Sequence, residues 1–168
     1  MIGLTWRGMG KTGIEIVKVP LEEVISDLLK AYADEWLAHY QYWVAAVTLK
    51  GVDADTFRPV LMEMSAHELK HAEKLAKRII QLGGKPVLQF EKLVATSGCG
   101  YIPPPEDPTN YEQLVKDILK AEQCAIRFYS KMVEKYRLTD VVTHEVFEEL
   151  LEDEVEDEQT WEDFLAKL

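Results

Sequence analysis

Glu68 and His71 lie three positions apart in the stretch Ser-Ala-His-Glu-Leu-Lys-His, residues 65 to 71. On a helix this spacing places a carboxylate and an imidazole on one face, where both can bind the same metal ion. Solvated helices carry the same spacing by chance. The pair alone is therefore a weak indication of a metal site.

Three more glutamates stand near the middle of their own predicted helices, at the same level as Glu68: Glu35, Glu122 and Glu154. Four carboxylates buried at one level would repel one another unless cations lay between them. Each could instead be an ordinary surface residue of an acidic protein, but this explanation weakens when four coincide. Carboxylates with imidazole suit iron or manganese, so we predict a buried two-metal site.

The two-metal pattern of four-helix bundles takes one Glu from each of two helices and a Glu-x-x-His motif from each of the other two. The fourth helix departs from this pattern here, because Asp157 stands where the second histidine is expected. Aspartate can bind a metal ion, so we expect an asymmetric site. Glu158, one turn after Glu154, is the competing candidate for this ligand.

Tyrosines accompany two of these glutamates. Tyr42 follows Glu35 by seven positions and Tyr129 follows Glu122 by seven, so each tyrosine lies on the face of its glutamate. Core packing is the simpler explanation, and a hydrogen bond or an electron supplied to a metal site is the functional one. Among the remaining histidines, His39 is a candidate outer contact to the site. His67 and His144 are expected on the surface.

Four long segments with apolar residues at three- and four-residue spacing predict the helices that carry these side chains. They cover residues 21 to 49, 55 to 82, about 110 to 137 and 141 to 167. Proline and glycine mark the boundaries of the first two helices. Thr109 or Asn110, and Thr139 or Asp140, are the expected N-caps of the last two.

Short links join the first helix to the second and the third to the fourth, so each pair should form an antiparallel hairpin. Residues 83 to 109 contain Pro86 and the run Pro103-Pro104-Pro105, and they are long enough to cross from one end of a bundle to the other. We therefore predict an all-α fold, a four-helix bundle with one long crossover between helices 2 and 3. It occupies residues 21 to 168, and residues 1 to 20 form an N-terminal arm.

The composition disfavours several other classes of protein. A formal net charge of −11 opposes binding to nucleic acid or to anionic membranes. No stretch reaches the ~18 apolar residues of a membrane span, and residues 1 to 20 lack the apolar run of a signal peptide, so we expect a cytoplasmic protein. The two cysteines, Cys99 and Cys124, are too few for a secreted disulfide scaffold and do not form a CxxC zinc motif.

Residues 21 to 167 resemble the ferritin-like superfamily in their four helices, central glutamates and single long crossover. Within it, the stretch Ala-Glu-Gln-Cys-Ala-Ile-Arg at residues 121 to 127, with Ser97-Gly98-Cys99, resembles the Dps-like proteins, also called thioferritins. The resemblance implies a redox thiol pair beside a two-iron site. The implied thiols are Cys99 and Cys124, the implied metal ligands are Glu35, Glu68, His71, Glu122 and Glu154, and Asp157 is the position that departs from the family.

The resemblance also implies an activity and an assembly. It predicts a ferroxidase that oxidises Fe(II) with hydrogen peroxide or oxygen at a centre of two iron ions per subunit, where manganese or zinc could substitute. The ferric product would be stored inside a homo-oligomeric cage of 12 subunits, which limits oxidative stress. Some Dps proteins bind DNA through lysine-rich tails, but the arm of this chain is only weakly basic, so we expect no binding to nucleic acid.

The role of the cysteines has two interpretations. Cys124 follows Glu122 by two residues and points about 200° away from it around the helix, which argues against binding the same ion. A redox disulfide with Cys99 and two inert thiols both agree with the sequence. The bundle also permits a rubrerythrin-like peroxidase or a manganese catalase without iron storage, or a metal-free structural bundle.

Overall fold

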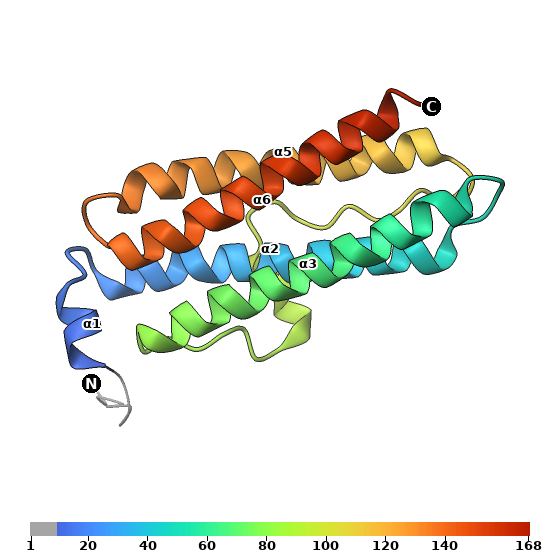
Figure 1. Ribbon diagram of the computed structural model, residues 1–168. Coiled ribbons are helices and arrows are strands. Elements are labelled where there is room, and N and C mark those ends of the chain that lie inside the picture. The colour runs from blue at the N-terminus through green and yellow to red at the C-terminus, as the bar shows by residue number, and fades with distance from the viewer. Residues whose placement is uncertain (1–9) are drawn as a thin grey trace.

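The computed structural model describes residues 10–168 and consists of two antiparallel helix pairs packed into a bundle (Figure 1). One pair is α2 (Leu21–Thr48) with α3 (Ala54–Gln81), and the other is α5 (Tyr111–Tyr136) with α6 (Val141–Leu165). Three short helical segments, α1 (Lys11–Glu15), η1 (Phe90–Lys92) and α4 (Leu93–Thr96), lie outside these four. Because the described residues form helices and no strand, the all-α prediction is confirmed.

The helix ends follow the predicted signals. Asn110 accepts a hydrogen bond from the Gln113 amide (3.0 Å) and Asp140 accepts one from the Thr143 amide (3.1 Å), so Asn110 and Asp140 are the N-caps of α5 and α6. The turn after α2 needs Gly51, whose φ is +108°. A Cβ atom there would also lie 2.6 Å from the Tyr111 hydroxyl.

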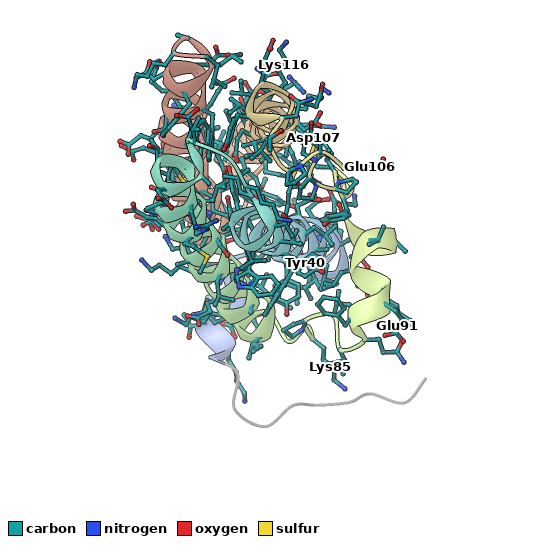
Figure 2. The ribbon with its side chains drawn as sticks, turned by 90° about the vertical axis from the view of Figure 1, so that its right-hand side faces the viewer. Tyr40, Lys85, Glu91, Glu106, Asp107 and Lys116 are labelled. Atoms are coloured by element: carbon teal, nitrogen blue, oxygen red, sulfur yellow. A yellow bond between two sulfur atoms is a disulfide. The ribbon has the colours of Figure 1, made fainter. Side chains whose placement is uncertain are left out.

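The segment between α3 and α5 runs along the bundle from the end of α3 to the start of α5, which confirms the long crossover (Figure 1). It contains η1 and α4, which the sequence analysis had not separated from the loop. Figure 2 looks along the bundle and shows α4 outside the four long helices, on the side of Tyr40. Leu93 of α4 packs there against Ala33 and Leu37 of α2.

The predicted N-terminal arm begins with residues 1–9, which are outside the described residues. In its described part, α1 carries no buried residue. The chain then reaches the bundle, where the Lys18 amide donates a hydrogen bond to the Thr139 carbonyl (2.8 Å). None of the helices in residues 10–168 is both long and apolar enough to cross a membrane.

The apolar core is divided into two clusters, one towards each end of the bundle. The first includes Tyr42, Leu61, Leu119 and Trp161, and the second includes Leu28, Leu75, Tyr129, Phe147 and Leu150. Every one of the four long helices contributes to both clusters. The polar residues of the predicted site occupy the stretch of each helix between its two contributions, so burial on both sides holds them at one level.

Candidate metal centre

Three of the four long helices bring a compact group of ligand atoms together at this level. Glu35 comes from α2, Glu68 and His71 from α3, and Glu154 from α6, and one ligand atom of each lies within 4.8 Å of all the others. All four side chains are buried. These three helices thus present their acids at one height.

His71 is the centre of this group. Its Nδ1 lies 3.5 Å from Glu35 Oε2 and 3.3 Å from both Glu68 Oε2 and Glu154 Oε1. His71 Nδ1, both Glu68 oxygens and Glu154 Oε1 are buried and have no hydrogen-bond partner. Polar atoms buried in this way are costly unless something compensates them. Their chemistry, oxygen and imidazole nitrogen converging on one point, fits iron or manganese.

The buried carboxylates of this group shift the pKa values of one another and of His71. Burial, together with the charges of neighbouring carboxylates, raises the pKa of Glu68 well above its usual value and also raises that of Glu154. Burial alone would lower the pKa of His71, but Glu154, Glu35 and Glu68 outweigh it and raise that pKa strongly. A divalent cation among these carboxylates would reverse their preference for protons.

An outer carboxylate orients His71. Asp153 Oδ2 lies 3.0 Å from His71 Nε2, on the side of the ring away from the glutamates. Metal-binding histidines commonly donate their second N–H to a carboxylate, which fixes the tautomer and the orientation of the ring. The sequence analysis did not select Asp153, although an acidic residue directly before Glu154 was a visible signal.

Glu122 and the two tyrosines form reciprocal contacts between α2 and α5. The Tyr42 hydroxyl donates a hydrogen bond to Glu122, and the Tyr129 hydroxyl donates one to Glu35. Each tyrosine thus contacts the glutamate of the opposite helix, whereas the sequence spacing had placed it beside the glutamate of its own. Trp161 extends one of these contacts, because its Nε1 donates to the Tyr42 hydroxyl (2.9 Å).

Burial and the negative charge of Glu154 together raise the pKa of Glu122 well above its usual value. Glu122 lies outside the group of four around His71, but it lines the same cavity as Glu35, Glu68 and Glu154. Glu154 thus lies beside both His71 and Glu122.

Asp157 rather than Glu158 turns inward from α6. Asp157 is 6% exposed and its Oδ2 is a further buried oxygen without a hydrogen-bond partner, while Glu158 is only partly buried. Burial, with the charge of Glu122, raises the pKa of Asp157 to about 6. The structure therefore leaves Asp157 as the candidate for the position where a histidine was expected.

Two histidines that the sequence analysis placed on the surface are partly buried. His67 Nδ1 lies 3.8 Å from Asp157 Oδ2, and its ring centroid is 5.5 Å from that of His71. His144 Nδ1 lies 2.9 Å from the Val133 carbonyl oxygen. The surface prediction was wrong for His144, whose side chain is 18% exposed, because it considered the face of one helix and not the neighbouring helix. The His67 side chain is 41% exposed and lies at the surface as predicted, beside Asp157. His39, the predicted outer contact, has its Nδ1 2.8 Å from the carbonyl oxygen of Ser65 and 2.9 Å from its hydroxyl.

Cys99 and Cys124 form a disulfide that joins the crossover to α5. Asp34 holds the crossover in place beside it: the amides of Gly98 and Cys99 donate hydrogen bonds to its carboxylate at 3.2 and 2.9 Å, and so does the Ser97 hydroxyl. Sequence reasoning missed Asp34 because its partners lie in an irregular loop more than sixty residues away.

One small cavity connects the disulfide to the carboxylates. Glu35, Glu68, Glu122 and Glu154 line it together with Cys99. Its volume of about 30 Å³ suits an ion, a water molecule or a small oxidant and is too small for an organic substrate.

Comparison with known proteins agrees with this arrangement. Residues 25–168 match the family described as ferritin-like domain. The chain is 26% identical over 160 residues to a DNA protection during starvation protein of Pyrococcus furiosus, covering 95% of this chain and 83% of that one. It is 31% identical over 133 residues to a bacterioferritin of Desulfovibrio desulfuricans, covering 79% of this chain and 68% of that one.

Solved structures extend the likeness to three dimensions. The bacterioferritin-related protein of Bacteroides fragilis, a dodecameric thioferritin, is 31% identical with a TM-score of 0.88, over 94% of both chains. A Dps of Listeria monocytogenes is 14% identical with a TM-score of 0.78, over 85% of this chain and 93% of that one, and shares the fold.

Proposed function

Because this chain belongs to the ferritin-like domain family, of which it is a Dps-like member, we propose that it oxidises Fe(II) and stores the ferric product in a protein cage. The observation that carries the proposal is the group of buried, unpartnered ligand atoms on Glu68, His71 and Glu154. Metal ligands are also assigned to Glu35, Glu122 and, at the position of the expected histidine, Asp157.

In this proposal two Fe(II) ions are the substrate. Each gives up one electron, and one hydrogen peroxide accepts both electrons with two protons, so that its O–O bond breaks and two water molecules form. Glu68 and Glu154 would help to hold both ions as carboxylate ligands. The Tyr42 hydroxyl donates a hydrogen bond to Glu122, and the Tyr129 hydroxyl donates one to Glu35. These hydrogen bonds fix the orientation of both carboxylates before any ion binds.

The disulfide supports a redox role for Cys99 and Cys124. Both cysteines are bonded to each other, and Cys99 lines the cavity that the carboxylates also line. We place the protein in the cytoplasm, where the rare disulfides of ordinary mesophilic proteins are usually catalytic or redox-sensing. The pair is therefore assigned a redox role beside the centre, in which the two thiols would give two electrons and two protons to one hydrogen peroxide, forming the disulfide and two water molecules. Hydrogen peroxide is the preferred oxidant that the resemblance to thioferritins implies.

A cage of 12 subunits is the proposed assembly. The dodecameric thioferritin of Bacteroides fragilis supports it, since the likeness covers nearly the whole chain. Large apolar side chains also remain exposed on the single subunit, notably Tyr40, Trp43 and Val47 of α2 with Phe90 and Val94 of the crossover. Exposed apolar groups of this kind mark contact surfaces. Twelve chains of 19.3 kDa give about 230 kDa, which gel filtration separates clearly from a dimer.

Anaerobic loading with Fe(II) followed by peroxide or oxygen tests the activity. We expect faster oxidation with peroxide, and a ferric core that stays with the cage through gel filtration. A rubrerythrin-like peroxidase or a manganese catalase would consume peroxide and retain no such core. A metal-free structural bundle would take up no ion and oxidise none, which would refute the proposal.

The name of the Pyrococcus furiosus relative mentions DNA protection, and that name describes the relative only. For this chain we propose protection through removal of Fe(II) and peroxide, without binding to nucleic acid, because its net charge is −11. A shifted band of duplex DNA in a native gel at near-physiological salt would contradict this.

A further inference from the structure

The seam between α3 and α6 pairs a histidine with an aspartate twice. His71 faces Asp153 with 3.0 Å between Nε2 and Oδ2, and His67 faces Asp157 with 3.8 Å between Nδ1 and Oδ2. Both histidines are on α3 and both aspartates on α6. Because the two helices run antiparallel, a step of four residues on each leads from one pair to the next, about one helical turn away.

Burial is inverted between the two pairs. In the first, the His71 side chain is 4% exposed and the Asp153 side chain 39%. In the second, the Asp157 side chain is 8% exposed and the His67 side chain 41%. The inner partner is thus the histidine in one pair and the aspartate in the other, while the outer partner has the same half-exposed position in both.

The inner partners have a further property in common. Each has one buried polar atom without a hydrogen-bond partner, which is Nδ1 on the side of the glutamates in His71 and Oδ2 on the side of His67 in Asp157. His71 is oriented by Asp153 through its other nitrogen, as metal-binding histidines usually are. Asp157 has no such hydrogen bond, and the group nearest to providing one is the His67 imidazole. A shift of less than 1 Å would bring these two atoms to hydrogen-bond distance.

We propose that His67 is the positioning residue of the second metal position, where it orients Asp157 as Asp153 orients His71. The inference rests on the proposed two-metal function and adds a role to a residue outside the ligand set. The imidazole N–H donates to Asp157 Oδ2 and leaves the remaining oxygen of that carboxylate for the ion. The pair keeps the composition of the His71–Asp153 pair but exchanges inner and outer members.

This exchange bears on metal selectivity. An oxygen ligand replaces an imidazole nitrogen at the second position, so five carboxylates and one imidazole surround the two ions. Carboxylate oxygens suit manganese, whereas imidazole suits zinc as well as iron. The second position should therefore discriminate against Zn(II) more strongly than the first.

The test is an anaerobic titration of the assembled protein with Co(II), whose visible absorption reports each binding event separately from catalysis. Wild type is expected to bind two ions per chain. His67→Ala should weaken the second ion about tenfold to a hundredfold and leave the first unchanged. His67→Gln retains an N–H donor and should keep most of the affinity for the second ion. His144→Ala, a partly buried histidine of α6 with a backbone contact, is the matched control and should bind like wild type.

An exchange variant separates positioning from a general loss of structure. Asp157→His alone leaves His67 without its carboxylate. His67→Asp combined with Asp157→His places a histidine at the buried position and an aspartate at the half-exposed position, as in the His71–Asp153 pair. The double variant should bind the second ion at least as tightly as wild type and more tightly than Asp157→His alone.

The outcomes distinguish the inference from the proposed function. Two ions bound with unchanged affinity in His67→Ala would overturn the inference and leave the function intact. Equal losses in His67→Gln and His67→Ala would also overturn it, because hydrogen bonding would then not be the property that matters. A wild-type protein that binds no Co(II) and no Fe(II) would overturn both.

Discussion

Replacing Glu68 by glutamine should stabilise the metal-free protein and at the same time abolish its metal binding. Glu68 is 1% exposed and neither of its oxygens has a hydrogen-bond partner. Burial and the negative charges of Glu154 and Glu35 raise its pKa well above the usual value, so the ionised form is strongly disfavoured. Glutamine keeps the shape of the side chain and is neutral at every pH, so folding requires neither a buried charge nor the uptake of a proton at this position, and its amide can donate to the neighbouring carboxylates.

The size of the effect follows from this environment. An unsatisfied buried polar group costs about 1–3 kcal/mol, so the free energy of unfolding of the metal-free protein should rise by about that amount. For a domain of this length, ~1 kcal/mol shifts the melting temperature by about 2–4 °C. Wild type gains about 2.7 kcal/mol when the metal concentration is a hundred times its Kd, and Glu68→Gln gains nothing. The order of stability of the two proteins should therefore reverse when metal is added.

Thermal unfolding followed by circular dichroism measures this, at one protein concentration, first with a chelator and then with anaerobic Co(II). Glu73→Gln is the matched control, because Glu73 is an exposed glutamate on the same helix. It should melt like wild type under both conditions. If Glu68→Gln melted below wild type in the presence of chelator, the unpartnered carboxylate would not be a destabilising feature and the reasoning would be wrong.

Three other substitutions have distinct expected outcomes. Asp157→Asn should increasingly stabilise the metal-free protein relative to wild type as pH rises from about 4 to about 6, by up to about 3 kcal/mol. The raised carboxyl pKa of about 6 means that the unfolded wild type loses this proton in that range while the folded protein keeps it, so wild type loses stability. Chemical denaturation from about pH 4 to about pH 7 measures the difference, and a difference that stays constant would contradict the expectation. Cys124→Ser should lower the unfolding free energy by about 2–4 kcal/mol, since the disulfide to Cys99 closes a loop with a sequence separation of 25, and reductant should produce the same loss in wild type but none in the variant. Tyr42→Phe removes the hydrogen bond to Glu122 and should weaken ion binding about tenfold to a hundredfold in a Co(II) titration, while an unchanged titration would show that packing alone accounts for the tyrosine.

The fold was largely predictable because its signals are local. Apolar spacing, the caps at Asn110 and Asp140 and the turn at Gly51 depend on residues within one or two helical turns. The crossover was predictable as a long link, but not its packing. The small helix α4 has only four residues, and it is held outside α2 by the contact of Leu93 with Ala33 and Leu37 rather than by a periodic pattern of its own.

For the site, the sequence by itself determined the level of the ligands. The rise per residue of a helix is fixed, so acids at the centres of four helices of similar length lie at one height however the helices are rotated. Glu35, Glu68, Glu122 and Glu154 could be selected on that basis. The three-residue spacing between Glu68 and His71 is equally independent of the surrounding structure.

Only the tertiary structure decided which side chains face one another across the helices. Tyr42 contacts Glu122 and Tyr129 contacts Glu35, over sequence separations of 80 and 94, because α2 and α5 are antiparallel and in this register. The contact of His67 with Asp157 depends in the same way on α3 and α6. A helical pattern gives the direction of a side chain relative to its own axis, whereas its partner depends on the rotation and register of the neighbouring helix, which packing along the whole bundle sets.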